Sequence, residues 1–471
     1  MKQILVILSG VFTLLVTSCR KDSFITSRDA EISITADSIR YDTVFTSTGS
    51  VTQVFKIINE NSQKLRLDQI SLGGGSNSHF NINADGFTGP LITNIEIDAN
   101  DSIYVFTTVS IDPNAEELPF VVKDSIRIAY NGNERLVHLE AYGQNAHFLR
   151  NWEITTDTIW PNNLPYVILG GLLIKENATL TIEKGARLYF HSDAPLLVDG
   201  TLITQGSKDT SGRVYFKSDR LDLPYSGYPG SWPGIYFRVA SDNNVLNGAV
   251  ISNSYQGVVA QGPSASAAPK LILADCIIDN IYDAGVLGVA TSIRATNCVI
   301  SNAGGEASNN LSLVYGGNYD FTHCTVVTYN NSYITHKNPV FFLSNFIIEN
   351  NVKYPLDLTA SFTNCIFWGD GGSVEDEVLV SKDGSTVFDV QFTNCLYKVK
   401  NPPLNVTLKD MILNEDPAFD STDAEKRFFN FQLKENSPAL NKGVSTPLVT
   451  DAAGNPRVVG AQADLGAYER Q

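Results

Sequence analysis

Short runs in which apolar and polar residues alternate fill the chain from about residue 31 to residue 145. Val54–Ile58, Ile103–Phe106 and Ser125–Ile128 are examples, and turn formers such as Gly73-Gly74-Gly75 separate such runs. Alternation with a period of two places the apolar side chains on one face of a strand. Many short strands of this kind with turns between them indicate an antiparallel β-sandwich. We therefore predict such a sandwich over residues 31–145.

After residue 145 apolar triplets recur at distances of about two dozen residues. Three such triplets have equivalents 24, 21 and 26 residues later: Leu172–Ile174 and Leu196–Val198, Leu180–Ile182 and Thr201–Ile203, Leu188–Phe190 and Val214–Phe216. Three strand-like runs per repeat are what a three-sided coil of parallel strands requires. We therefore predict a parallel β-helix over residues 146–415.

Five cysteines follow the same repeat, and three of them stand in the near-identical words FTHC, FTNC and FTNC. In a parallel β-helix, equivalent residues of successive turns stack about 4.8 Å apart, and a small apolar thiol fills a narrow interior. We predict that one strand position, at the start of a strand in each turn, is filled in order by Ala249, Cys276, Cys298, Cys324, Phe346, Cys365 and Cys395.

The residue before each of these positions is mostly small and polar. We predict that stacked amides hydrogen-bond along the axis at this position, which is occupied by Gly248, Asp275, Asn297, His323, Asn345, Asn364 and Asn394. Because repeated residues are usually architectural, we interpret this column as structural and not as catalytic. Without Cys19 the cysteines are odd in number and none forms a CxxC pair, which argues against a disulfide framework and against a zinc site.

Four stretches resemble known families. VTQVFKIINENSQKLRLDQISL, with IDANDSIYVFTTVSIDP downstream, is similar to immunoglobulin-like domains of the abnormal-spindle/Hydin type, which usually act as spacers or adaptors. LLIKENATLTIEKGARLYFHSDAPLLVDGTLITQG resembles the opening turns of secreted right-handed β-helix proteins of the pectin-lyase-like fold, and GSWPGIYF is similar to a segment of β-helix surface lipoproteins of Gram-negative bacteria. The resemblances imply an all-β chain, with an N-terminal immunoglobulin-like β-sandwich followed by a right-handed parallel β-helix.

The fourth resemblance concerns the C-terminal segment, residues 416–471. SPALNKGVSTPLVTDAAGNPRVVGAQADLGAYE resembles the choice-of-anchor segment of bacterial surface proteins. A solenoid needs its open end covered, so we expect this segment to form a C-terminal cap, with Arg457 paired to Asp464 or Glu469. The positions that match the pattern are Asp451, Gly454, Pro456, Arg457, Asp464, Gly466 and Glu469.

The N-terminus combines a basic start with the apolar run Ile4–Val16 and with small residues before Cys19. This pattern indicates a signal peptide over residues 1–18. The four residues ending at Cys19 resemble a bacterial lipobox, which implies lipidation of Cys19 and a tether over residues 19–30; an ordinary signal peptide is the alternative. Since Arg20 and not an acid follows the cysteine, the resemblance favours the outer membrane, with possible exposure at the cell surface.

Charge and motif content limit the functions that we expect. Asp and Glu outnumber Lys and Arg by 50 to 34, a net charge of −16, which opposes binding to nucleic acid. The Asn-Thr-Asp, Asp-Asp, Gly-His-Gly and Arg-Ile-Lys motifs of polygalacturonase-like hydrolases are missing from the sequence, as are pectate-lyase-like signatures. We therefore predict no catalytic residue, no metal site and no cofactor. Weaker acid, base or oxygen-ligand candidates are interpreted as structural: Asp275, Asp279, Asp283, His323, His336, Asp112–Glu117 and Ser241–Asn244.

The loop Leu221–Gly234 holds Tyr225, Tyr228 and Trp232 among glycines and prolines, where aromatic rings are expected near the surface. Flat rings can pack against sugars, and Tyr315 and Tyr319 would extend the strip. The alternative is that these rings simply cover the strand beneath them.

Together these features predict a lipid-anchored surface protein whose β-helix binds extended ligands, with glycans as the expected class, without catalysis. Two alternatives stay open: a polysaccharide lyase or glycoside hydrolase that acts on the face of the β-helix, and a structural or adhesive surface protein.

Overall fold

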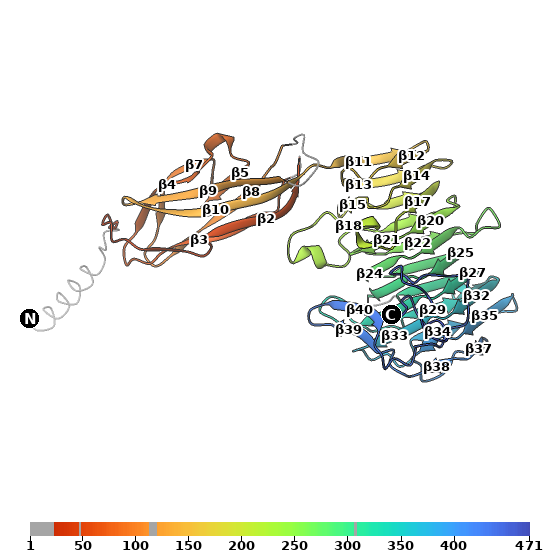
Figure 1. Cartoon of the computed structure of the whole chain (residues 1–471). Helices are drawn as coiled ribbons and strands as arrows, with labels where there is room; N and C mark the ends of the chain where they lie inside the picture. Colours follow the sequence, from red (N-terminus) through yellow and green to blue (C-terminus); the bar gives the residue numbers. More distant parts are fainter. Residues whose placement is uncertain (1–22, 47–48, 113–119, 306–308) are drawn as a thin grey trace, which may run out of the picture. The chain divides into compact units, whose positions relative to one another are not determined.

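The computed structural model describes residues 23–46, 49–112, 120–305 and 309–471. The signal peptide and Cys19, predicted above, lie outside these residues. The chain divides into two compact units, Met1–Asn145 and Ala146–Gln471. Both are built from β-strands, and the described residues contain three helices, all of them short 3-10 turns (Figure 1).

The first unit is a β-sandwich of two five-stranded sheets. All strand pairs are antiparallel except β2 and β10. Alternate side chains such as Phe55, Ile57, Leu67 and Ile128 are buried between the sheets, as the period-two pattern predicts. One sheet contains β1 (Ile32–Ile34), β3 (Gln53–Asn59), β8 (Ser102–Val109), β5 (Phe80–Ala84) and β6 (Phe87–Thr88); the other contains β2 (Ser38–Phe45), β10 (Asn133–Gln144), β9 (Phe120–Tyr130), β4 (Leu65–Leu72) and β7 (Leu91–Ile97).

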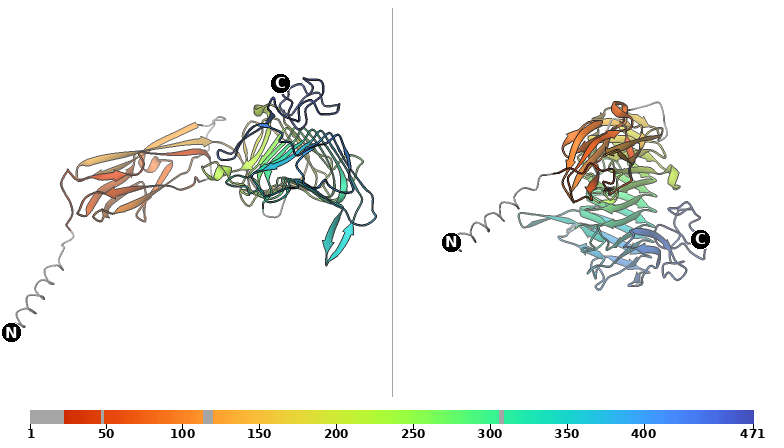
Figure 2. Two further views of the ribbon diagram at one scale, coloured as in Figure 1. Left: turned by 90° about the horizontal axis from the view of Figure 1, so that it is seen from below. Right: turned by 90° about the vertical axis from the view of Figure 1, so that its left-hand side faces the viewer.

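The second unit is a parallel β-helix in which 26 strands coil into three faces (Figures 1 and 2). Face 1 holds the first halves of β11 (His147–Ile154) and β13 (Tyr166–Ile174), then β15 (Arg187–Phe190), β18 (Val214–Ser218), β21 (Ala249–Ser252), β24 (Ile277–Ile281), β26 (Val299–Ala303), β28 (Thr325–Tyr329), β33 (Ile366–Asp370), β36 (Leu396–Tyr397) and β38 (Ile412–Leu413).

Faces 2 and 3 are built in the same way, and two long strands run through both. Face 2 holds the second halves of β11 and β13, then β16 (Leu196–Val198), β19 (Ile235–Phe237), β22 (Val258–Gln261), the first parts of β25 (Val286–Thr296) and β27 (Leu311–Thr322), β29 (Phe341–Ser344) and β34 (Val378–Ser381). Face 3 holds β12 (Thr158–Trp160), β14 (Thr179–Ile182), β17 (Thr201–Gln205), β20 (Asn244–Asn247), β23 (Leu271–Ala274), the last parts of β25 and β27, β32 (Leu358–Thr363), β35 (Phe388–Thr393) and β37 (Thr407–Lys409).

The register of the first turns agrees with one predicted repeat and corrects two. Leu172 pairs with Leu196, as the offset of 24 residues predicts. Leu180 pairs with Leu202, and Leu188 pairs with Phe216, so these offsets are 22 and 28 residues and not 21 and 26. The longer offset arises because residues 206–213 form an inserted loop between β17 and β18.

The cysteines stack inside the coil, as predicted, but Phe346 is not in the column. All five thiols are buried and free, and the residues that follow them pair in register from Ile277 to Leu396. Because Thr325 pairs directly with Ile366, Cys324 stacks on Cys365 with nothing between. Phe346 begins β30 (Phe346–Glu349), which pairs with β31 (Val352–Pro355) in a hairpin that leaves the coil (Figure 2, cyan).

The backbone conformation explains which residue types precede the cysteines. Its residues have φ between +50° and +59°, a left-handed turn that Gly, Asn and Asp tolerate better than other residues. Axial hydrogen bonds also occur, from Asn297 to Asp275 and from Asn364 to His323. Asn345 is outside this column, because its side chain holds the backbone of Asp383 instead.

The C-terminal segment lies along the coil and does not act as the expected end cap. Its strands β39 (Phe419–Asp423) and β40 (Phe428–Leu433) form a hairpin. Buried residues of this segment pack on the outer side of face 1, because that side carries apolar residues on neighbouring strands. The shared core contains Phe419, Phe431, Leu433, Ala439, Leu465 and Ala467 of the segment, and Val299, Val327, Ile366 and Leu396 of face 1.

Candidate functional site

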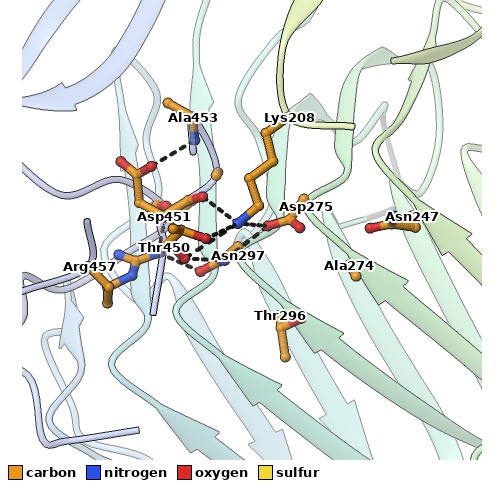
Figure 3. A network of polar contacts seen from close by, with 12 residues as sticks. Lys208, Asn247, Ala274, Asp275, Thr296, Asn297, Thr450, Asp451, Ala453 and Arg457 are labelled. Atoms are coloured by element: carbon orange, nitrogen blue, oxygen red, sulfur yellow. Dashed lines mark hydrogen bonds and ion pairs between the residues drawn. The ribbon is translucent and has the colours of Figure 1, made fainter. Parts of the chain in front are cut away.

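A polar network ties the C-terminal segment to the left-handed column (Figure 3). Lys208 Nζ lies 3.1 Å from Asp275 Oδ1 and donates to the carbonyl of Asp451 across 2.7 Å. Asn297 Nδ2 donates to Asp275 Oδ1 across 2.9 Å and to the carbonyl of Thr450 across 3.0 Å. The donors of Lys208 and Asn297 bind acceptors on both sides, so the network holds the C-terminal segment against the coil.

Arg457 is the buried centre of the segment, with 1% of its surface exposed. Its guanidinium donates to the carbonyls of Gly466 and Ala467 and to Asn297 Oδ1. Asp464 and Glu469, its predicted partners, accept backbone amides instead. The predicted direct pairing is therefore replaced by carbonyl acceptors. Burial lowers the pKa of Arg457, and the nearby carboxylates oppose this shift.

Tyr225 and Tyr228 are the predicted ligand-binding residues that the structure leaves exposed, at 44% and 36%. Their rings meet edge to face, with centroids 5.3 Å apart, and Tyr228 meets Tyr333 in the same way at 4.9 Å. The Arg220 guanidinium lies 4.1 Å from the centroid of Tyr225, a cation–π contact. These contacts hold the two rings in place before any ligand arrives.

The loop that carries these tyrosines is fixed from below by successive turns. Asn253 donates to the carbonyl of Ser226, and Asn280 donates to that of Gly227 and to Asn253 Oδ1. Arg427, from the C-terminal segment, donates to the same Gly227 carbonyl. The loop is therefore held in a defined conformation at the surface, between faces 1 and 2.

Trp232, in contrast, belongs to the core, and the expectation of a surface ring is wrong for it. Only 1% of its surface is exposed, and its ring stacks on Phe190 with centroids 4.4 Å apart. Its Nε1 donates to the carbonyl of Ser252, and its backbone bridges Ser254 of the next turn. Trp232 is thus a strand-like residue of the coil, although glycine and proline surround it in the sequence.

Tyr319 is also buried, at 1% exposure, so it does not extend an aromatic strip. It points into the coil from β27, and its hydroxyl donates to the carbonyl of Gly316. Tyr315 is half-buried where β27 bends from face 2 to face 3, with φ of +64°. The structure therefore does not bring Tyr315 and Tyr319 together with Tyr225 and Tyr228 as one strip.

Two exposed tyrosines that sequence reasoning missed lie at the same corner of the coil as the loop, on the next two turns. Tyr255 and Tyr282 are each 47% exposed and stack with centroids 5.3 Å apart. A Cβ added at Gly230 would lie 3.3 Å from the Cβ of Tyr282, so the loop and this pair adjoin. The signal was available, because Asn253-Ser254-Tyr255 and Asn280-Ile281-Tyr282 repeat at the 27-residue offset of the coil. We call Tyr225, Tyr228, Tyr255 and Tyr282 the tyrosine flank.

The outer side of face 2 borders the tyrosine flank and is largely apolar. Tyr236 lies close to both: burial, and then the nearby Asp283 and Tyr255, raise the pKa of its phenol. One register column of outward side chains crosses this face, and it contains Leu173, Leu197, Tyr236, Val259, Leu287, Ser312, Phe342 and Leu379. Val259 and Ser312 of this column are buried, so face 2 presents apolar side chains along its length with interruptions at these two positions, and exposed rings lie at its edge.

The three acids of the 275–283 stretch do not converge. Asp275 lies in the left-handed column, and Asp279 accepts hydrogen bonds from Ser301 and Asn302 on the outer side of face 1. Burial raises the pKa of Asp279. Asp283 accepts from Gln256 between faces 1 and 2. They therefore do not form the opposed carboxylate pair of a glycosidase.

The two candidate histidines are buried. His323 occupies the left-handed column, as predicted, and burial lowers its pKa to about 3. His336 is buried against Glu377, with Nε2 3.2 Å from Oε2. Neither ring is placed to meet a ligand from solvent.

One histidine that sequence reasoning did not single out is half-exposed and oriented by an acid. His191 Nδ1 lies 2.7 Å from Asp219 Oδ2. Asp219 is mostly buried, and burial raises its pKa. A carboxylate that fixes one ring nitrogen and leaves the other toward solvent is an arrangement used in general base catalysis.

In the described part of the chain, no group of three or more His, Cys, Asp or Glu side chains could hold a metal ion. Ser241 and Asn244 bond to each other, and most of the stretch Asp112–Glu117 lies outside the described residues. The described helices include none with the length and apolar character needed to cross a membrane.

Comparison with known proteins does not assign a family. No family model and no curated protein sequence matches the chain. The first solved structure found, a family 123 glycoside hydrolase from Clostridium perfringens, is 11% identical, and the match covers 25% of this chain and 26% of that chain with a TM-score of 0.18. The chain thus spans about a quarter of the length of that protein.

Two other solved structures each match a different share of the chain. The PapD-like domain 7 of human CEP192 is 10% identical, with 27% of this chain and 92% of that chain covered and a TM-score of 0.17. The catalytic domain of a GH87 α-1,3-glucanase in complex with nigerose is 11% identical, with 79% and 80% covered and a TM-score of 0.20. At these TM-scores the likenesses carry no argument, and the assignment of the folds rests on strand pairing.

Proposed function

We propose that this protein is a lipid-anchored surface protein of the outer membrane whose β-helix binds extended glycans without altering them. The observation that carries the proposal is the tyrosine flank beside the apolar outer side of face 2. Exposed rings held by neighbouring residues offer large contact area to sugar rings at low conformational cost. The column of outward side chains runs along the axis, so it suits a chain-like ligand.

Lipidation of Cys19 is part of this proposal and rests on the lipobox-like sequence that ends at this residue. Stable anchoring requires more than one acyl chain. Growth of the producing cells with labelled palmitate is expected to label the protein, and Cys19→Ser is expected to abolish the label and to release the protein from the membrane fraction. Unlabelled but membrane-bound wild-type protein would contradict the lipid anchor.

Glycan binding is tested with a polysaccharide panel of xylan, mannan, dextran, starch and polygalacturonate in affinity gels. We expect retention by at least one polymer and loss of that retention in the double variant Tyr255→Ala/Tyr282→Ala. Tyr104→Ala is the matched control, because Tyr104 is also 47% exposed but lies on the sandwich. Absence of retention, or equal retention in the double variant, would contradict the proposal and favour a structural or adhesive role.

A polysaccharide lyase or hydrolase is the second candidate, and the His191–Asp219 pair favours it. The same panel is therefore assayed for new reducing ends and for unsaturated products. Product formed by wild type and lost in His191→Ala would establish this alternative. Under the primary proposal no product forms, and His191→Ala binds as wild type does.

A further inference from the structure

The turn from face 2 to face 3 carries two insertions that stand on either side of two uninterrupted strands. Residues 262–270 connect β22 to β23, and residues 345–357, including the β30–β31 hairpin, connect β29 to β32. Between them, β25 and β27 run through the turn without a break. The insertions are three strand steps apart along the axis, which corresponds to about 14 Å at the usual strand spacing. Two walls therefore enclose a floor made of two strands.

The space between these walls is a hollow of about 520 Å³, within the range of small-ligand sites. Residues 263–269 form one side of its lining, and Asp357 and Thr359 form the other. The floor includes Ser292, Arg294, Asn318 and Asp320. We call this hollow the corner trough; none of the residues predicted from the sequence to bind ligand lines it.

The first wall is rigid and leaves room for a ligand. Asp242 accepts a hydrogen bond from the Ser264 hydroxyl across 2.8 Å and one from the Ala265 amide across 3.1 Å. The wall itself consists of Pro, Ser and Ala, whose side chains are small. On the opposite side, the carbonyl of Asp357 accepts the amide of Gly317 across 2.8 Å. A site whose walls are already fixed loses little conformational entropy when a ligand binds.

The floor offers both donors and acceptors to a ligand. Arg294 Nε lies 3.6 Å from Asp320 Oδ2, and both side chains are about half exposed. Ser292 Oγ accepts the amide of Lys270, which leaves its hydroxyl hydrogen to donate outward. Thr291 also belongs to the lining, but it is a buried position that alternates with the outward Ser292 and Arg294, as Ile293 is. The groups that the floor offers to a ligand are therefore those of the outward side chains.

We propose that the corner trough is a second binding site, specific for a neutral, hydroxyl-rich ligand such as a short oligosaccharide or the end of a glycan chain. A guanidinium and a carboxylate side by side present donors and acceptors that match adjacent sugar hydroxyls. Since Arg294 is opposed by Asp320 and Asp357, the lining is net acidic and disfavours uronates and other anionic sugars. This site is independent of the tyrosine flank.

The test uses the full chain and titrates cellotriose, mannotriose, maltotriose and trigalacturonate in a calorimeter at millimolar concentrations. At least one neutral trisaccharide is expected to bind. Arg294→Ala should weaken that binding at least about tenfold, since it removes charge-assisted hydrogen bonds. Ala267→Trp, on the exposed wall, should block the trough by bulk without touching the floor. Arg66→Ala is the matched control, because Arg66 is a half-exposed arginine paired with Glu96 on the sandwich.

Thermal unfolding of each variant is measured to show that the β-helix is intact. Binding of a neutral trisaccharide that both Arg294→Ala and Ala267→Trp weaken, and that Arg66→Ala and Tyr255→Ala/Tyr282→Ala do not, supports the corner trough. The inference is overturned if no neutral trisaccharide binds, if trigalacturonate alone binds, or if Ala267→Trp leaves the affinity unchanged. Loss of binding only in the tyrosine double variant would also overturn it, while supporting the tyrosine flank.

Discussion

The Asn364 side-chain amide donates a hydrogen bond to Nε2 of His323 across 2.9 Å, one turn of the coil away. Both residues have the left-handed backbone conformation, and both side chains are buried against the C-terminal segment. Since Nε2 accepts, the proton of the neutral ring is on Nδ1. The pair shows that the repeated residues before the cysteines serve the turn, the axial contacts and the attachment of the C-terminal segment together.

The first prediction concerns acid sensitivity at His323. Burial lowers its pKa to about 3, below the usual value of about 6.5 in the unfolded chain. Between these pH values the unfolded state therefore binds more protons than the folded state. The buried neutral ring contributes to the free energy of unfolding above about pH 6.5, and this contribution is lost as the pH falls. We expect His323→Asn to remove about 2 kcal/mol of the stability loss between about pH 7.5 and pH 5.

This prediction is checked by denaturant unfolding of both proteins at the two pH values. Asn is the chosen replacement because it tolerates the left-handed turn. The difference between the proteins at the higher pH, where the ring is neutral in both states, reports packing alone and serves as the control. An unchanged pH dependence in His323→Asn would show that the ring does not cause the acid sensitivity.

The second prediction separates backbone strain from hydrogen bonding at Asn364. Its side chain exchanges hydrogen bonds with the backbone of Val444 at 2.8 and 2.9 Å, and its φ is +57°. Asn364→Gly loses these bonds but keeps the turn, whereas Asn364→Ala loses the bonds and also strains the turn. We expect the free energy of unfolding of Asn364→Ala, measured in denaturant, to be about 1 kcal/mol lower than that of Asn364→Gly. Equal losses would indicate that the backbone shifts to relieve the strain.

The sequence could predict the coil because the residues that build it are determined by local requirements for burial and backbone conformation. A buried thiol, preceded by a residue in the left-handed conformation, stands directly before β24, β26, β28, β33 and β36 on face 1, so the pair recurs in the sequence. The same pattern misplaced Phe346, because Ser344-Asn345-Phe346-Ile347 imitates the start of a strand and actually leads into a hairpin. Local pattern alone does not reveal whether an apolar run enters the coil or an insertion.

The candidate sites were harder to predict because they combine distant segments. Gly and Pro around Trp232 suggested a surface loop, but the ring fills the coil above Phe190. The corner trough needs one wall from residues 263–269 and another that includes Asp357 and Thr359. Only the strand register aligns these walls, and the register depends on the length of every intervening insertion.

The third prediction concerns the reactivity of the cysteine column. Cys276, Cys298, Cys324 and Cys365 are fully buried, and burial raises the pKa of each thiol. The thiolate is the reactive species, so native protein should react with a thiol reagent only as fast as it unfolds. A Cys19→Ser chain is used so that only the five buried thiols are counted. They should all react in denaturant, and rapid reaction under native conditions would contradict the stacked arrangement.

The fourth prediction concerns Glu469, whose pKa burial raises to about 7. The folded state therefore binds the proton more tightly than the unfolded chain does, so stability falls as the pH rises from about 4.5 through about 7. Glu469 Oε1 and Oε2 accept the amides of Val459 and Asp464. Gln keeps one acceptor and removes the charge. The free energy of unfolding of Glu469→Gln, relative to that of wild type, should therefore rise by about 1 to 2 kcal/mol from pH 5 to pH 8, once solvent screening is allowed for.

Unfolding of wild type and Glu469→Gln is followed across this range, and the sign of the change separates this group from His323. Protonation of His323 weakens the fold on acidification, whereas protonation of Glu469 strengthens it, so the two substitutions should alter the pH profile in opposite directions. Because Glu469 also donates its own amide to Asp451 across 3.0 Å, the backbone of the segment is held in the variant. A stability difference that stays constant with pH would show that Glu469 is ionised in the fold across the whole range.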